Sequence, residues 1–167
     1  TADDLIREWF DIVVANSQEP AKLGTAAVYT TDAGLDLSQM INKLLIGAVS
    51  YAQATSKYFA VLLDQDNTVA RNGTSTYTAM EHYWDESFGY FGAARDYARY
   101  SDEQLAGKSA DDFTFDSNGD GQIDLKSEYN FGLSRNAGKR DKGGSGVDFT
   151  KEIFDAYLAG RTAITNQ

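Results

Sequence analysis

Apolar residues recur with a helical period along most of the chain, and short polar segments separate these stretches. The first stretch lies within residues 5–14, and Pro20, which disfavours a continuing helix, closes it. Further helices are expected over residues 36–63, 78–97, 125–139 and 148–164. No segment alternates apolar and polar residues for long enough to make a strand. The pattern therefore predicts an all-α fold, a helical bundle of about five helices.

Capping residues mark where two of these helices begin. Asp36 with Gln39, and also Thr78 with Glu81, have the spacing of a capping box, in which both side chains bond to backbone N–H groups. The helix over residues 36–63 carries a wide apolar face, so we expect it to be central, with neighbours on more than one side. That face consists of Met40, Ile41, Leu44, Leu45, Ala48, Tyr51, Ala52, Thr55, Phe59 and Leu62.

Polar or glycine-containing segments separate the expected helices. They cover residues 28–34, 67–74, 101–124 and 140–146, and we expect them to be loops. A chain of 167 residues is long enough to bury a hydrophobic core, and aromatic residues make up 13% of it, which argues against disorder. A chain of this length is typical of one domain, and no internal repeat is visible, so we expect a single helical domain over residues 1–167.

Residues 116–124 read Asp-Ser-Asn-Gly-Asp-Gly-Gln-Ile-Asp, the spacing of the front of an EF-hand-type calcium loop. Calcium takes about six to eight oxygen ligands, and alternate positions of a tight loop supply them. Gly121 lies where the chain must turn sharply, and Ile123 is expected to attach the loop to the core. The expected ligands are Asp116, Asn118, Asp120, the Gln122 carbonyl and Asp124. The alternative is a solvated acidic turn, but few turns combine these residues at these offsets.

The end of the loop departs from the EF-hand pattern. Position 12, where a bidentate glutamate is usual, is Ser127, and Glu128 follows one residue later. We expect Asp124 to cap a helix, so that Glu128 lies in its first turn and reaches the ion through a small change of path. The alternative is that Glu128 has another role and calcium is held more weakly. Because the loop occurs once, we interpret the ion as structural.

The charge and the cysteine content exclude several classes of protein. The formal net charge of −10 disfavours binding to nucleic acid or to anionic membranes. The absence of cysteine excludes disulfides, thiolate zinc sites and cysteine nucleophiles. No signal peptide or apolar run of membrane length is present. These features fit a calcium-rich compartment outside the cytoplasm.

A second group of candidate ligands lies on the helix expected from residue 78. Glu81 and Asp85 are i, i+4 neighbours, and the same spacing separates His82, the only histidine, from Glu86. Such a group suits iron, zinc or manganese. The alternative, which the spacing alone favours, is structural: Glu81 caps the helix and His82 bonds to a carboxylate. Asp85 and Glu86 then face water or pair with arginines. The candidates to complete a metal site from elsewhere are Glu128, Asp141 and Glu152.

Five segments carry a family resemblance. The longest, residues 81–92, reads EHYWDESFGYFG. The others are GLDL at 34–37, NKLLIGA at 42–48, IDLKSEYNFG at 123–132 and AGKRD at 137–141. In order and in sequence these segments resemble the DUF4856 family of bacterial envelope proteins, and they span about residues 30–142.

The resemblance implies a secreted protein or lipoprotein of a Gram-negative bacterium, with a periplasmic, outer-membrane-associated or extracellular location. Such proteins are similar to the imelysin-like proteins, helical bundles with a His-x-x-Glu metal motif that are associated with iron acquisition. In this chain His82-x-x-Asp85 departs from that motif. Family members are longer, which implies that this chain is the C-terminal part of a longer protein and that any lipid anchor lies outside it.

Enzymatic motifs are absent from the sequence. There is no serine nucleophile elbow, phosphate-binding loop or dinucleotide fingerprint, and His-Glu-x-x-His does not occur. The leading hypothesis is a non-enzymatic, calcium-binding envelope protein linked to iron or other metal acquisition. The first alternative is a structural or assembly protein that contacts other envelope or surface proteins through its many tyrosines. The second alternative is a metal-dependent enzyme with a site around His82.

Overall fold

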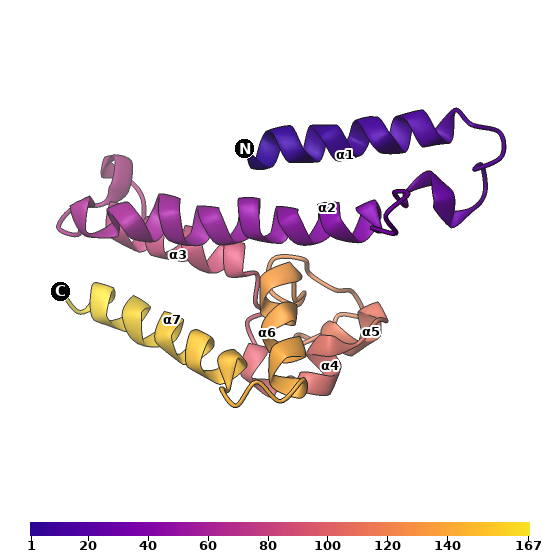
Figure 1. The fold of residues 1–167 in the computed structure, drawn as a ribbon. Helices are drawn as coiled ribbons and strands as arrows, with labels where there is room; N and C mark the ends of the chain where they lie inside the picture. The colour runs from indigo at the N-terminus through magenta and orange to yellow at the C-terminus, as the bar shows by residue number, and fades with distance from the viewer. The chain divides into compact units, whose positions relative to one another are not determined.

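The computed structural model describes all of residues 1–167 and is built from helices joined by loops, with isolated β-bridges and no β-sheet (Figure 1). The all-α prediction is confirmed. The α-helices are α1 (Ala2–Ser17), α2 (Leu37–Leu45), α3 (Ala79–Phe91), α4 (Asp102–Ala106), α5 (Ala110–Phe113), α6 (Gly132–Lys142) and α7 (Phe149–Thr165). No helix is both long enough and apolar enough to cross a membrane.

Short polar side chains cap the helices where the sequence places them. The Thr78 hydroxyl accepts a hydrogen bond from the Glu81 N–H, and the Glu81 carboxylate accepts one from the Thr78 N–H, so the predicted capping box opens α3. The Asp36 carboxylate caps α2 by accepting from the Gln39 N–H at 3.1 Å. The Gln39 side chain does not complete that box, because it accepts a hydrogen bond from Lys43 instead.

The helical segment after α2 is irregular. Two π-helical stretches, Ile46–Tyr51 and Gln53–Tyr58, precede a 3₁₀ stretch at Phe59–Asp64. Leu37, Ala54 and Leu62 are buried, but the expected wide buried face is wrong at Met40, Leu45 and Tyr51, which are 38%, 39% and 59% exposed. Tyr51 lies in the first π stretch, where turns hold more residues than α turns, so its side chain leaves the regular helical stripe. Met40 and Leu45 lie in the regular helix α2, where neighbouring elements do not cover them.

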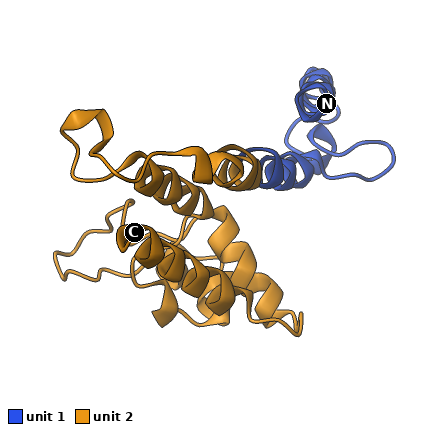
Figure 2. Ribbon diagram, turned by 90° about the vertical axis from the view of Figure 1, so that its left-hand side faces the viewer, with its two compact units in different colours: residues 1–49 blue, residues 50–167 orange.

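The chain divides into two compact units, residues 1–49 and residues 50–167 (Figure 2). In the first unit α1 and α2 lie side by side, and the connection between them is tied to α1. There the Asn16 side-chain amide donates to the Val28 carbonyl at 3.2 Å, and the Lys22 ammonium donates to the Asn16 side-chain oxygen at 2.8 Å. The single domain expected over residues 1–167 stays a prediction.

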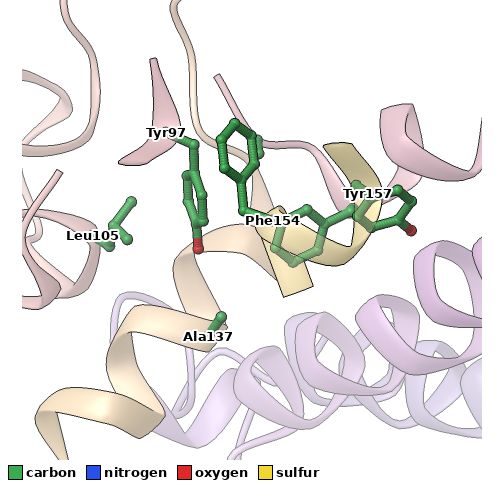
Figure 3. Packing of buried hydrophobic residues seen from close by; sticks show 7 residues of the cluster. Tyr97, Leu105, Ala137, Phe154 and Tyr157 are labelled. Atoms are coloured by element: carbon green, nitrogen blue, oxygen red, sulfur yellow. The ribbon is translucent and has the colours of Figure 1, made fainter. Parts of the chain in front are cut away.

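The main hydrophobic core belongs to the second unit. It consists of Phe91, Ala93, Tyr97, Leu105, Ala137, Phe154 and Tyr157, drawn from α3, α4, α6, α7 and the segment after α3 (Figure 3). Helices α4 and α6 pack closely because α6 has a glycine at the contact. A Cβ atom on Gly138 would lie 2.5 Å from the Cβ of Leu105, which is fully buried. The absence of a side chain at Gly138 therefore allows the short separation between α4 and α6.

Several predicted boundaries are wrong. Helix α3 ends at Gly92 rather than running to residue 97, because Gly92 takes a left-handed conformation with φ +74° that stops the helix. The expected loop over residues 101–124 contains α4 and α5, and capping boxes at Ser101 and Ser109 open these two short helices. The loops expected at residues 28–34 and 67–74 contain no α-helix, as predicted.

The boundaries of α6 also differ from the expectation. Helix α6 begins at Gly132 rather than at residue 125, and it continues to Lys142, so the expected link of residues 140–146 begins later. Residues 125–127 instead form a turn, and an antiparallel bridge between Thr114 and Tyr129 then holds the chain against the preceding segment. Pairing with a distant segment replaces the local helix that the apolar spacing predicts.

Candidate functional site

A loop with a closed base contains the predicted calcium motif. The bridge between Thr114 and Tyr129 joins its two ends, and the Phe115 N–H donates to the Glu128 carbonyl at 3.3 Å. Asn130, which is fully buried, fixes this base to the rest of the unit. Its side-chain oxygen accepts from the Ala94 N–H at 2.8 Å, and its amide donates to the Phe113 carbonyl at 3.1 Å. The loop of residues 115–128 therefore leaves and re-enters a rigid part of the fold.

Glu128 binds the backbone at both ends of this loop. One carboxylate oxygen accepts from the Ser117 N–H, the Ser117 hydroxyl and the Asn118 N–H, at 2.8, 2.7 and 3.2 Å. The other oxygen accepts from the Asp124 N–H at 2.9 Å. The N–H of Asp124 and then the hydroxyl of Ser117 lower the pKa of the Glu128 carboxyl, because they stabilise its charged form. Glu128, which is only 2% exposed, thus holds the loop closed as an anion.

Asp116 organises the tight turn inside the loop. One of its oxygens accepts from the N–H groups of Gly119 and Asp120, and the other accepts from the Gly121 N–H at 2.7 Å. Both glycines have positive φ, +76° and +82°, a conformation that side chains with a Cβ rarely take. The sharp turn predicted at Gly121 is present, and the first residue of the motif wraps the backbone around its carboxylate.

The remaining acidic residues of the motif make shorter-range contacts. The Asn118 oxygen accepts from the Asp120 N–H, and Asp120 accepts from the Gln122 N–H, both at 2.8 Å. Asp124 accepts from the Lys126 N–H and from the Ser127 hydroxyl, which lowers the pKa of its carboxyl. Each carboxylate offers about four acceptor positions, so Asp120 and Asp124 keep lone pairs that no hydrogen bond uses.

The side chains of the motif do not converge on one point. No group of three or more histidine, aspartate and glutamate side chains is placed to hold a metal ion. An ion in this loop would therefore require side chains to rotate around a backbone path that Asp116 and Glu128 already fix. Binding of calcium by Asp116, Asn118, Asp120, Gln122, Asp124 and Glu128 stays a prediction.

Two local expectations for the loop are wrong. Asp124 does not cap a long helix, because residues 124–128 form one isolated turn closed by the Glu128 N–H donating to the Asp124 carbonyl at 2.7 Å. Ile123 does not attach the loop to the core, since its side chain is 39% exposed. Glu128 and Asn130 attach the loop instead, through hydrogen bonds rather than apolar contact.

The second candidate group lies on α3 against α7. The Arg161 guanidinium donates to the Glu81 carboxylate at 2.7 Å and to the Asp85 carboxylate at 2.9 Å. The Thr165 hydroxyl adds a bond to the same Glu81 oxygen at 3.0 Å. Glu81 therefore has the structural role that the sequence allowed as an alternative: it caps α3 and, with Asp85, joins α3 to α7 through one arginine.

His82 lies on the neighbouring face of α3, next to aromatic rings. Its Nε2 atom is 3.6 Å from a Glu86 oxygen, and its ring stacks on that of Tyr77 with centroids 5.8 Å apart. Two of the three candidate partners on other elements, Asp141 and Glu128, have other contacts. Asp141 accepts from the N–H groups of Phe149 and Thr150 at the start of α7, and every hydrogen bond of Glu128 comes from its own loop.

Sequence reasoning missed Arg161, Ser117 and Asn130. Arg161 is about 80 residues from Glu81 along the chain, and nothing in local spacing indicates their ion pair. The roles of Ser117 and Asn130 have recognisable features in the sequence. A serine directly after the first aspartate of the motif has both a hydroxyl and an N–H to offer the late glutamate. A buried asparagine beside a loop base can bond to backbone on two sides.

Replacing Arg161 with glutamine is expected to lower the free energy of unfolding by about 1–3 kcal/mol, because the nearly buried Glu81 loses its counter-charge. The Thr78 N–H and then Arg161 lower the pKa of Glu81 in the folded state below its ordinary 4.5. The pair therefore stabilises the fold above that pH, and its contribution is lost as the pH falls through the lowered value. Urea unfolding at neutral and at acid pH measures this.

The exposed pair of Arg99 with Asp96 provides the control for this prediction. Replacing Arg99 with glutamine should cost about 1 kcal/mol or less, since solvent screens exposed ion pairs. If the Arg161 variant lost no more stability than the Arg99 variant, or lost as much at acid pH as at neutral pH, the proposed role of Glu81 would be contradicted.

Comparisons with known proteins agree with one expectation. The family model described as "Domain of unknown function (DUF4856)" matches residues 6–167, nearly the whole chain. No curated protein matches the chain, and no solved structure does. The matched range includes the closed loop of residues 115–128, the acidic face of α3 and all of the hydrophobic core. The chain therefore belongs to the DUF4856 family.

Proposed function

We propose that this protein is a non-enzymatic, calcium-binding protein in which one ion rigidifies the loop of residues 115–128. The observation that carries the proposal is the path of the loop backbone. Asp116 accepts three backbone N–H groups at the tight turn, so the loop is already wound around the first residue of the motif. Calcium binding then requires Asn118, Asp120 and Asp124 to turn their side-chain oxygens toward Asp116, because a hard cation takes oxygen ligands.

The affinity of the loop for calcium should be modest. Both oxygens of Glu128 are occupied by loop hydrogen bonds, so it supplies no free bidentate ligand unless these bonds break. The ion would then depend on Asp116, Asn118, Asp120, the Gln122 carbonyl, Asp124 and water. Such a ligand set resembles the weaker extracellular calcium modules, whose dissociation constants are about 10⁻⁴–10⁻³ M.

The modest affinity supports a location outside the cytoplasm, where calcium is abundant enough to fill the loop. The lack of cysteine and the acidic composition are compatible with that location. In this proposal the protein acts in the cell envelope or at the surface by binding rather than by catalysis. A transition metal at His82 is a separate hypothesis, and the pairing of Glu81 and Asp85 with Arg161 removes two of its four expected ligands from easy reach.

Thermal unfolding with and without calcium tests the proposal. At about 10 to 100 times the dissociation constant, an ion that binds only the folded state adds about 1.4–2.7 kcal/mol to the free energy of unfolding. We therefore expect about 10 mM calcium to raise the melting temperature relative to excess chelator. The variant Asp116→Ala should lose this difference, whereas the control Asp32→Ala, an exposed aspartate in another loop, should keep it. Identical melting curves in calcium and chelator would contradict a structural ion.

A further inference from the structure

A cavity of about 580 Å³ opens on the second unit, and no residue of the calcium motif lines it. Its walls come from α3, α6, α7 and the irregular helical segment of residues 51–59. Aromatic rings dominate these walls, notably Phe59, Trp84, Phe91 and Tyr157. The volume lies within the range of about 300–1,000 Å³ that is typical of small-molecule sites, which are mostly apolar with a few placed polar groups.

The inner wall of the cavity is part of the folded core and is therefore rigid. Phe91, Ala137 and Tyr157 are buried members of the main cluster (Figure 3). The Trp84 ring nitrogen donates to the Tyr157 carbonyl at 3.0 Å, which fixes the orientation of the indole. Fixed aromatic rings offer an apolar guest both stacking and edge contacts.

Two charged side chains of opposite sign line the same cavity and are exposed at its rim. Arg140 comes from the end of α6, and Glu152 comes from the first turns of α7. Neither side chain takes part in any ion pair of the second unit. An unpaired cation and an unpaired anion at one apolar cavity are therefore available to a ligand.

We propose that this cavity binds a small zwitterionic aromatic molecule, of the class of a free aromatic amino acid. The ring packs among Phe59, Trp84 and Tyr157, the ligand carboxylate pairs with Arg140, and the ligand ammonium pairs with Glu152. A simple carboxylate uses Arg140 but leaves Glu152 close to a like charge. A simple amine uses Glu152 but lies close to Arg140. Only the zwitterion satisfies both groups, which is how a site gains specificity from charge.

Three probes with one phenyl ring separate these cases: L-phenylalanine, 3-phenylpropionate and phenethylamine. The protein carries Trp9→Phe, so that Trp84, inside the cavity, is the only fluorescent indole. Trp84 emission and isothermal titration calorimetry follow binding. We expect L-phenylalanine to bind with a dissociation constant on the order of 0.1–1 mM, and each single-charge probe to bind about threefold to tenfold more weakly.

Substitutions of the two charged rim residues then test which charge binds which probe. Arg140→Gln should weaken L-phenylalanine and 3-phenylpropionate but not phenethylamine, and Glu152→Gln should weaken L-phenylalanine and phenethylamine but not 3-phenylpropionate. Lys142→Gln, which changes an exposed cation of α6 outside the cavity, should alter none of the three. Ala156→Phe places a ring at an exposed lining position and should abolish binding while leaving the helical spectrum unchanged.

The proposal is overturned if the three probes bind equally, since the cavity would then recognise only the ring. It is also overturned if no probe binds with a dissociation constant below about 10 mM, or if Ala156→Phe leaves binding intact. A dimer that Ala156→Phe breaks into monomers would assign the cavity to a second copy of the chain and would likewise overturn it.

Discussion

Replacing Tyr157 with alanine is expected to lower the free energy of unfolding by about 3–5 kcal/mol, which is the usual cost of truncating a buried aromatic residue. The Tyr157 ring lies at the centre of the aromatic contacts in the core of the second unit. It contacts the rings of Phe59, Trp84, Phe88 and Phe91, with centroids 5.3–5.7 Å apart. Its hydroxyl lies 2.9 Å from the hydroxyl of Ser87, which is fully buried. Equilibrium unfolding in urea measures the loss.

Two companion variants divide this loss into its parts. Tyr157→Phe keeps the ring and removes only the hydroxyl, so it should cost about 1 kcal/mol through the unpaired Ser87 hydroxyl. Leu158→Ala changes the next residue of α7, whose side chain is 53% exposed, and should change stability by about 0.5 kcal/mol or less. A loss in Tyr157→Ala no greater than that in Leu158→Ala would show that the core is not organised around this ring.

Replacing Glu128 with glutamine is expected to open the loop of residues 115–128 whether or not calcium is bound. The four hydrogen bonds of Glu128 are all accepted by its carboxylate. A glutamine amide donates on one side, so one end of the loop would meet a donor where it needs an acceptor. Hydrogen exchange should report amides of Ser117, Asn118 and Asp124 that exchange at least about tenfold faster, because local opening costs less free energy.

Acid should reproduce this opening in the unchanged protein. The hydrogen bonds from Asp124 and Ser117 lower the pKa of Glu128 in the folded state. The stabilisation that it gives the loop is therefore present above its ordinary pKa of 4.5 and is lost as the pH falls through the lowered value. Glu103→Gln, at an exposed glutamate without hydrogen bonds, is the control. Equal loop exchange in the Glu128 and Glu103 variants would contradict the anchoring role.

The parts of the fold that the sequence predicts are those encoded by neighbouring residues. The capping box of Thr78 with Glu81 and the cap at Asp36 depend on residues three apart, and both form. The end of α3 at Gly92 was missed, although a glycine there is a common way to stop a helix, because the apolar period continues beyond it. Helical period alone also does not indicate the π turn of Ile46–Tyr51, at the end of which Tyr51 is exposed.

The parts that the sequence does not predict depend on contacts between distant residues. The bridge of Thr114 to Tyr129 replaces a helix that the pattern favours after residue 124, and no local feature indicates that partner. The choice between a metal site and an ion pair on α3 was left open for the same reason, since Arg161 lies on another helix. The loop motif itself was readable because a calcium loop places its oxygens at fixed offsets within one short segment.

Titration of calcium into chelator-treated protein measures whether the loop of residues 115–128 binds one calcium ion. Isothermal titration calorimetry at neutral pH should show one site per chain with a dissociation constant of about 10⁻⁴–10⁻³ M, stronger than for magnesium. The site should be absent from Asp116→Ala and present in Asp32→Ala. A calcium site in this loop is ruled out if the unchanged protein takes up no calcium at millimolar concentration, or if Asp116→Ala binds calcium equally well.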